Sequence, residues 1–306
     1  MRITSTILEI QSIEQNSGRH IQKRKGIDNK LASTSFLVFL ISFYHISINK
    51  RFLIILVSFY MLENKVAVVT GASSGIGYAT SLKLSKAGIR VAAGARRTDR
   101  LKDLEKQIIK NNGEIFIQKL DVTSKSMCDS MVNAVVKKWG KVDILINNAG
   151  LMPLSYFKNG KVEEWEQMVD VNIKGVLYCT SAVIPYMLEE KSGHIINISS
   201  VAGRIVFAGG SVYCATKHAI TAFSEGLRKE LSPKYNIRVT CIEPGAVSSE
   251  LLESITDESM TGFIQATKNI ETLQSDDIAN AILYAIQAPN HVNVNEILIR
   301  PTAQER

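Results

Sequence analysis

Tyr213 and Lys217 are the residues whose types and spacing most directly suggest chemistry. They are four residues apart in a segment with a helical pattern, so their side chains share one face. A phenol has a pKa of about 10, and a neighbouring ammonium group favours the phenolate and lowers that pKa. Tyr213 is therefore a candidate general acid and base. Because an isolated Tyr-x-x-x-Lys pair is usually ordinary helix surface, this hypothesis depends on the elements around it.

Ser200 is the third candidate residue, and its position links the pair to a sheet. It follows the predicted strand His194–Ile198 and precedes Tyr213 by thirteen residues. In a parallel sheet, ligands bind in a crevice at the carboxyl ends of the strands. We therefore expect Ser200 to lie in the same crevice as Tyr213 and Lys217.

A glycine-rich turn, Thr70–Gly77 (TGASSGIG), connects a β-branched strand to a helix. Glycines let the backbone turn tightly and approach a pyrophosphate, and the helix start offers unpaired N–H groups. The spacing is GxxxGxG rather than the commoner GxGxxG. An ordinary strand-to-helix turn is the alternative, but the flanking elements favour a nucleotide site. Its candidate cofactor residues are Gly71, Ser73, Ser74, Gly75, Ile76 and Gly77.

The end of the second predicted strand indicates which nucleotide binds. An NAD site places an acidic residue there to hold the ribose 2′-hydroxyl. This chain instead has Arg96 and Arg97 in the segment Ala93–Arg97. A guanidinium group binds a 2′-phosphate well. The sequence therefore favours NADP, with solvated loop arginines as the alternative.

Strands and helices alternate from Lys65 onward, which predicts a doubly wound parallel sheet with helices on both faces, an α/β Rossmann-type fold in a single domain. The predicted strands are Val66–Thr70, Ile89–Ala93, Ile115–Leu120, Val142–Ile146, His194–Ile198, Arg238–Ile242 and Glu296–Ile299. Helices are expected after the glycine turn to Lys86, from Thr98 to about Gly113, from Ser124 to Gly140, and over Val162–Glu190 and Tyr213–Leu231.

The composition excludes several classes of protein. Hydrophobic residues make up 45% and charged residues 21% of the 306 residues, which is typical of a globular chain and not of a disordered one. The four cysteines lack metal-ligand spacing, so we expect no metal site, no disulfide framework and a reducing compartment. The net charge is +7, but residues 1–60 hold 8 Lys and Arg against 3 Asp and Glu. The remaining chain therefore gives no electrostatic reason to expect a nucleic-acid partner.

Residues 1–60 are predicted to be separate from the domain at 61–306. Two apolar runs, Phe36–Tyr44 and Phe52–Leu62, are each shorter than the roughly 20 residues of a spanning helix. Three interpretations stay open: an upstream stretch preceding a true start at Met61, an atypical membrane anchor, or a poorly ordered tail. The first is favoured because a coherent domain begins directly after Met61.

Taken together, the motifs resemble the short-chain dehydrogenase/reductase superfamily. They are Thr70–Gly77, Asn147–Gly150 (NNAG), Ser200, Tyr213–Lys217 (YCATK) and Pro244-Gly245, in that order. The resemblance covers about Leu62 to Gln304. Gly94–Leu101, Asp170–Gly175 and Asn295–Gln304 are similar to an NADP-dependent branch that includes 3-hydroxy acid (serine-type) dehydrogenases and clavulanate-pathway aldehyde reductases.

This resemblance implies roles for individual residues. Tyr213 would exchange the proton, Lys217 would lower its pKa and bind the nicotinamide ribose, Ser200 would hold the substrate oxygen, and Asn172 would anchor a water that relays protons to Lys217. Further cofactor contacts are implied for Asp121, Val122, Asn148, Ala149, Gly150, Pro244 and Gly245, in addition to Arg96 and Arg97. Many NADP-binding members carry a basic residue where this chain has Ser74. The arginines must then supply the charge for the phosphate.

The substrate is not identified by the sequence. Ala246–Ile270 is the expected lid, with apolar contacts from Met260, Phe263 and Ile264 and polar ones from Ser248, Ser249 and Glu250. A small 3-hydroxy acid is possible, with Lys268 or Arg204 as candidate carboxylate clamps. His194 is expected to be structural rather than a base.

The expected function is an NADP(H)-dependent carbonyl reductase or alcohol dehydrogenase that acts on a small molecule in the cytoplasm. The alternative is a cofactor-binding sensor or scaffold without turnover. A membrane-tethered version of the enzyme is a third possibility. The resemblance also implies a homo-tetramer or dimer formed through the helices that hold Asn172 and Tyr213.

Overall fold

The computed structural model describes residues 62–305, and a seven-stranded parallel sheet is its centre. The strand order is β3-β2-β1-β4-β5-β6-β7. The strands are β1 (Val66–Thr70), β2 (Arg90–Ala95), β3 (Ile115–Lys119), β4 (Ile144–Asn147), β5 (Gly193–Ile198), β6 (Ile237–Pro244) and β7 (Glu296–Ile299). The order reverses between β1 and β4, which is where such sheets bind ligands. The predicted Rossmann-type single domain is confirmed.

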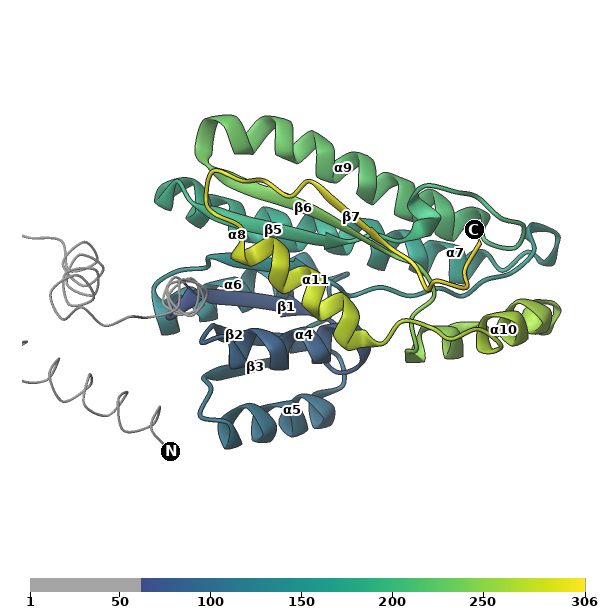
Figure 1. Cartoon of the computed structure of the whole chain (residues 1–306), viewed down its shortest axis with the longest axis horizontal. Coiled ribbons are helices and arrows are strands. Elements are labelled where there is room, and N and C mark those ends of the chain that lie inside the picture. The colour runs from purple at the N-terminus through teal and green to yellow at the C-terminus, as the bar shows by residue number, and fades with distance from the viewer. Residues whose placement is uncertain (1–61, 306) are drawn as a thin grey trace, which may run out of the picture. The chain divides into compact units, whose positions relative to one another are not determined.

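Helices cover both faces of the sheet (Figure 1). One face is covered by α4 (Gly75–Lys86), α5 (Thr98–Lys110) and α11 (Ser275–Gln287). The other is covered by α6 (Lys125–Trp139), α8 (Gly175–Glu190) and α9 (Ser211–Tyr235). Two shorter helices, α7 (Val162–Val169) and α10 (Thr261–Lys268), complete the set of α-helices in the described residues. In Figure 1, α10 lies beyond the carboxyl ends of the strands.

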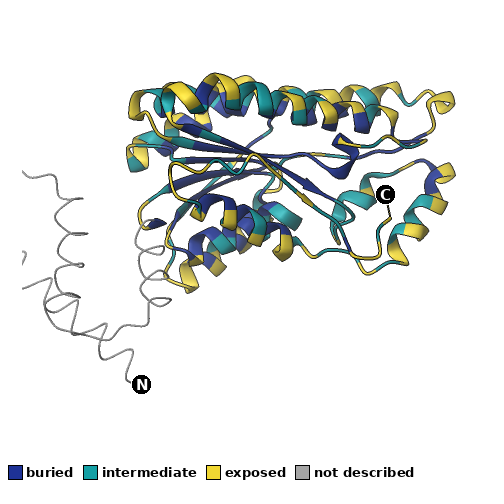
Figure 2. Ribbon diagram, turned by 45° about the horizontal axis from the view of Figure 1, so that its top comes forward, coloured by how far each residue is buried: buried dark blue, intermediate teal, exposed yellow. Residues whose placement is uncertain are grey.

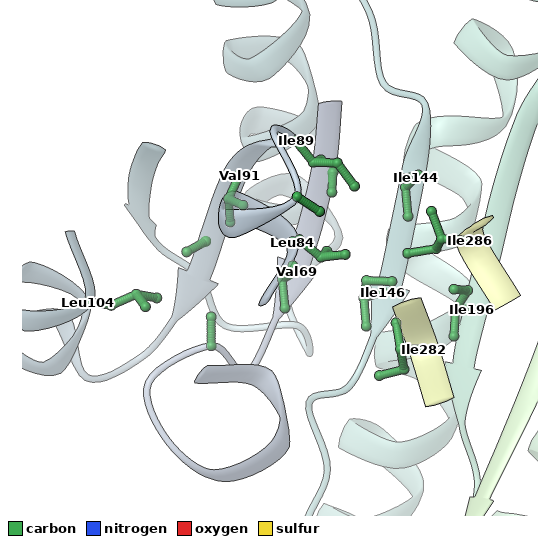
Figure 3. Packing of buried hydrophobic residues seen from close by; sticks show 14 of the residues in the cluster. Val69, Leu84, Ile89, Val91, Leu104, Ile144, Ile146, Ile196, Ile282 and Ile286 are labelled. Carbon is green, nitrogen blue, oxygen red and sulfur yellow. The ribbon is translucent and has the colours of Figure 1, made fainter. Parts of the chain in front are cut away.

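The two faces follow from alternation along each strand. In β1, Ala67 and Val69 belong to the cluster under α4 and α11, whereas Val66 and Val68 belong to the cluster under α6 and α8. Successive side chains of a strand point to opposite faces, so an all-apolar strand contributes side chains to the cores on both faces of the sheet. Figure 2 shows the resulting buried sheet between partly exposed helices. Figure 3 shows the first core, where Val69 and Leu84 pack near Ile146 and Ile282.

The helices differ from prediction in two places. The predicted helix Val162–Glu190 is interrupted by a π-helical turn at Asp170–Lys174, and π-bulges of this kind often mark functional sites. The predicted lid, Ala246–Ile270, contains α10, and α11 follows it where the sequence predicted no helix. The apolar series Ile278, Ile282 and Ile286 at helical spacing is the signal that could have found α11.

By length and composition, the stretch Val162–Glu190 alone among the described residues is apolar enough to cross a membrane. Val183 and Met187 of this stretch are fully buried in the core beside the sheet, as in a core helix of a globular domain. The three interpretations of residues 1–60 concern a segment outside the described residues.

Candidate active site

A cavity of about 1410 Å³ opens at the carboxyl ends of the strands. Its walls come from the segments that follow β1 to β7, so the sheet brings together motifs distant in the sequence. The predicted residues that line it are Gly71, Ser73, Ser74, Gly75, Ile76, Arg96, Arg97, Asp121, Val122, Asn148, Ala149, Gly150, Ser200, Tyr213, Lys217, Pro244 and Gly245. Two predicted site residues, Gly77 and Asn172, are not part of its lining.

The glycine turn has the backbone geometry of a phosphate cradle. Gly71 and Gly75 adopt positive φ angles of 64° and 55°, which L-residues rarely adopt. A Cβ at Gly71 would lie 2.9 Å from the Ala149 Cα atom. Gly77 has a different task, since a Cβ there would lie 2.5 Å from the Gly71 carbonyl oxygen. Gly77 therefore lets α4 pack closely against the turn rather than facing a ligand.

Thr70 and Asn148 hold this turn in place, and the sequence did not reveal that role. The Thr70 Oγ1 atom accepts hydrogen bonds from the backbone N–H groups of Asn148 and Ala149, both at 3.0 Å. The Asn148 amide donates back to the carbonyl oxygens of Thr70 (3.0 Å) and Gly71 (3.3 Å). These bonds join the ends of β1 and β4 at the point where the strand order reverses.

Arg97 reaches the glycine turn directly. Its guanidinium group donates to Ser74 Oγ at 2.6 Å and to Ser73 Oγ at 3.3 Å. Arg96 lines the same end of the cavity and interacts with Asp121. Burial opposes ionisation of Asp121, but hydrogen bonds from Thr123 and the charge of Arg96 outweigh it, so the pKa of Asp121 is lowered. Two cations beside a glycine cradle and a helix N-terminus fit a dinucleotide that carries an extra phosphate.

Glu250 forms ion pairs with Arg97 and Arg100, although the sequence assigned it to polar substrate contacts. Its carboxylate accepts from the Arg97 guanidinium at 2.7 Å and also contacts Arg100. Arg100 first and Arg97 second lower the pKa of Glu250 to about 2. Glu250 begins the 3₁₀ turn Glu250–Ser254 within the predicted lid, so a lid residue is bound to the cofactor end of the cavity.

Tyr213, Ser200 and Lys217 converge at the other end of the cavity. Tyr213 lies in the first turns of α9, and a hydrogen bond with Ser200 favours its ionised form. The Lys217 ammonium lies 5.7 Å from the Tyr213 ring centroid and donates to the Ile198 carbonyl at 2.9 Å. All three residues are at least nine-tenths buried.

The sequence predicted a lowered pKa for Tyr213, and this prediction is wrong in direction. Burial in the apolar cluster of Met152, Leu154, Met168, Ala202 and Met260 raises the pKa of Tyr213 to about 12 despite the bond from Ser200. Burial also lowers the pKa of Lys217 to about 8, because it disfavours the charged ammonium. Desolvation therefore outweighs the hydrogen bond with Ser200, and the phenol stays protonated near neutral pH.

Asn172 lies in the π-helical turn and is fixed by three hydrogen bonds. Its Oδ1 atom accepts from the Leu151 N–H at 3.0 Å, and its amide donates to the Leu151 carbonyl (3.0 Å) and to Thr216 Oγ1 (3.2 Å). Thr216 in turn donates to the Tyr213 carbonyl at 2.7 Å. Asn172 thus ties the loop after β4 to the helix that carries Tyr213. The proton-relay role implied by resemblance stays a prediction.

Neither of the two residues predicted to bind a substrate carboxylate, Arg204 and Lys268, lines the cavity. Arg204 donates to both carboxylate oxygens of the fully buried Glu243, at 2.8 and 2.9 Å, and also contacts Glu296. Lys268 ends α10 outside the residues that line the cavity.

His194 lies at the opposite end of β5 from Ser200, where its Nε2 atom bonds with Thr240 Oγ1 at 2.7 Å. It is structural, as expected.

Comparisons with known proteins agree with this geometry. The sequence profile of the short chain dehydrogenase family matches residues 65–260. An uncharacterized oxidoreductase from Staphylococcus saprophyticus is 48% identical over 245 residues, which are 79% of this chain and 98% of that protein. Among solved structures, the closed form of a serine dehydrogenase complexed with NADP+ is 36% identical with a TM-score of 0.73, covering 79% of this chain and 96% of that one. An alcohol dehydrogenase from the archaeon Thermococcus sibiricus, complexed with 5-hydroxy-NADP, is 27% identical with a TM-score of 0.70 over 79% of this chain and 98% of that one.

Proposed function

The chain belongs to the short-chain dehydrogenase family and is an oxidoreductase of that type, and from this premise we propose that it is an NADP(H)-dependent reductase of carbonyl compounds, or a dehydrogenase of the corresponding alcohols. The observation that carries this proposal is the placement of Tyr213, Ser200 and Lys217 at one end of a cavity whose other end is the glycine cradle. A dinucleotide that spans the two ends would present its nicotinamide beside Tyr213.

The preference for NADP over NAD rests on charge. Arg96 and Arg97 line the cradle end, and both cations favour a 2′-phosphate. The serine dehydrogenase and the Thermococcus enzyme, which resemble this chain in fold and sequence, were solved with NADP+ and 5-hydroxy-NADP. The residues proposed to hold the cofactor are the cavity-lining ones named above except Ser200, together with Gly77 as the packing glycine of the turn.

The proposed chemistry follows from the protonation states of the residues. The nicotinamide supplies or accepts the hydride when the cofactor is bound. Tyr213, whose pKa of about 12 keeps it protonated, donates its proton to the substrate oxygen during reduction. Lys217, with a pKa of about 8, is mostly charged near neutral pH and stabilises the phenolate that forms. The Ser200 hydroxyl holds the substrate oxygen.

A 3-hydroxy acid is a second candidate substrate class. It is favoured by the likeness to serine dehydrogenases, including the enzyme from Escherichia coli at 34% identity and a TM-score of 0.67. A sensor or scaffold without turnover is the remaining alternative. The buried convergence of Tyr213, Ser200 and Lys217 argues against it, because burying a lysine is costly without a functional reason.

We also propose a cytoplasmic homo-oligomer that acts on a small molecule. All four cysteines lie within the described residues and form no disulfide there, which suits a reducing compartment. Val169 and Leu177, on the helical stretch around Asn172, are 38% and 40% exposed. Apolar side chains exposed on this stretch suit the proposed contact between copies.

The proposed function is tested by measuring NADPH and NADH oxidation with a panel of aldehydes, ketones and oxo acids. Turnover that prefers NADPH supports the proposal. Tight NADPH binding without turnover of any compound would favour the sensor.

A further inference from the structure

The charges of the cavity are distributed unevenly. Of the described residues that line it, only Arg96, Arg97 and Lys217 are cationic. The two arginines lie at the cradle, and the Lys217 ammonium is directed to the Ile198 carbonyl beside Tyr213. Among the described residues, the cavity also has four acidic lining residues, of which Asp121 and Glu250 lie beside the two arginines and Glu253 and Glu305 are exposed.

The substrate half of the cavity, meaning the end beside Tyr213, has many apolar side chains in its walls. Phe207 and Phe263 stack with ring centroids 5.5 Å apart and an interplanar angle of 9°. Met260 is buried in the cluster against which they pack, and Met152 of the same cluster also lines the cavity.

Lys217 is the one cationic residue among the described residues that line this end, and it already donates to the Ile198 carbonyl. A substrate carboxylate placed here would therefore lose its hydration without gaining a further cationic partner, which is costly. An uncharged, apolar substrate would lose little.

Arg204 and Lys268 were the candidate cations for binding a substrate carboxylate, but neither lines the cavity. Arg204 is held by Glu243 and Glu296. We infer that the substrate is an uncharged carbonyl compound or alcohol with an apolar body, and not the anion of a hydroxy acid. This inference rests on the proposed function and narrows it.

Matched ester and acid pairs test the inference. We would measure kcat/KM with NADPH for methyl acetoacetate against acetoacetate, and for ethyl pyruvate against pyruvate. Each ester should exceed its acid by about tenfold or more, as expected when a site leaves a charged group unpaired. Equal or faster turnover of the acids would overturn the inference and leave the proposed function intact. A protein that binds no NADPH in a fluorescence titration would overturn the proposed function instead.

A pair of variants at the cavity mouth isolates the charge. Val206 lines the cavity and is 75% exposed, so longer side chains fit there. Val206→Arg should raise kcat/KM for acetoacetate severalfold relative to Val206→Gln, which has a neutral side chain. No difference between the two variants would contradict the assignment of poor acid turnover to missing positive charge.

A second inference comes from the Glu250 ion pair. One Arg97 guanidinium binds both Ser74 of the glycine turn and Glu250 of the lid. A 2′-phosphate held at Arg97 would meet the Glu250 carboxylate at the same group, and two anions sharing one guanidinium repel each other. We propose that Glu250 competes with the 2′-phosphate for Arg97 and thereby lowers the affinity for NADP(H). This second proposal also rests on the proposed function.

Binding measurements test this competition without turnover. Calorimetry with NADP+ and NAD+ would compare the wild type, Glu250→Gln and Glu258→Gln, the last being an exposed acid of the same segment. Glu250→Gln should tighten NADP+ binding by about threefold to tenfold and change NAD+ binding by less than about twofold, as expected for an exposed ion pair. Glu258→Gln should leave both constants unchanged.

A double variant shows whether Arg97 carries the effect. In an Arg97→Ala background, Glu250→Gln should no longer tighten NADP+ binding. An unchanged or weaker NADP+ constant in the single variant, or the same gain in the double variant, would overturn the competition. Failure of the wild type to bind NADP+ at all would overturn the proposed cofactor instead.

Discussion

Lys217 donates a 2.9 Å hydrogen bond from its ammonium to the carbonyl oxygen of Ile198, the last residue of β5. Ser200 follows Ile198 by two residues, and Tyr213 lies one helical turn before Lys217. This bond therefore fixes α9 relative to the strand that presents Ser200. The distance between the two hydroxyls that we assign to the substrate oxygen depends on it.

Removal of the Tyr213 hydroxyl should abolish most turnover. In Tyr213→Phe, kcat for carbonyl reduction should fall by about 100-fold to 10,000-fold, because the proton donor is lost. The dissociation constant for NADPH should change little. Tyr284→Phe, which alters a 64% exposed tyrosine of α11, is the control. Equal rates for Tyr213→Phe and wild type would show that the assigned proton donor is wrong.

The two arginines at the cradle should set the cofactor preference. Arg96→Ala and Arg97→Ala should each weaken NADP+ binding by about tenfold, since a charge-assisted hydrogen bond contributes about 1.5–3 kcal/mol. NAD+ binding should be nearly unaffected, because that cofactor lacks the phosphate. Arg90→Ala, which removes an exposed pair with Glu114 far from the cradle, should change neither constant. A preference for NADP+ that survives both cradle variants would rule out this origin of selectivity.

Arg204 should contribute to stability rather than to substrate binding. Arg204→Met leaves Glu243 buried without its ion-pair partner and should lower the free energy of unfolding by about 3 kcal/mol, measured by urea denaturation. Arg90→Met breaks an exposed pair and should lower it by less than about 1 kcal/mol. Similar losses in the two variants would argue against a structural role for the buried pair.

His194 should make the fold sensitive to acid. Burial first, and the charges of Arg238 and Lys65 next, hold the pKa of His194 well below its usual 6.5. Its Nδ1 atom, moreover, has no hydrogen-bond partner among the described residues. Below about pH 6.5 the unfolded chain takes up a proton at this residue that the folded chain does not, so stability falls as pH falls, by up to about 1.4 kcal/mol per pH unit.

Urea denaturation between pH 7 and pH 4.5 measures this slope. His194→Leu should have a shallower decline than the wild type, because the titrating group is absent. His291→Gln, at an exposed position, should decline as the wild type does. Parallel curves for His194→Leu and the wild type would exclude His194 as the source.

The sequence alone determined the succession of strands along the chain and many of the residues around the cavity. Short β-branched runs such as Val66–Thr70 and glycines at Gly71 and Gly75 are local signals, because backbone conformation and burial restrict which residue types fit. The spacing of Tyr213 and Lys217 likewise needs only the helical period. These features were predictable because each depends on residues close in the chain.

Only the tertiary structure decided the pKa values, hydrogen bonds and ion pairs of these side chains. The raised pKa of Tyr213 depends on apolar side chains from distant segments, and the anchoring of Asn172 depends on Leu151 and Thr216. Two ion pairs, Arg204–Glu243 and Arg97–Glu250, depend on which loops meet at the ends of neighbouring strands. Desolvation and ion pairing are set by three-dimensional surroundings, and a linear pattern of residues does not contain them.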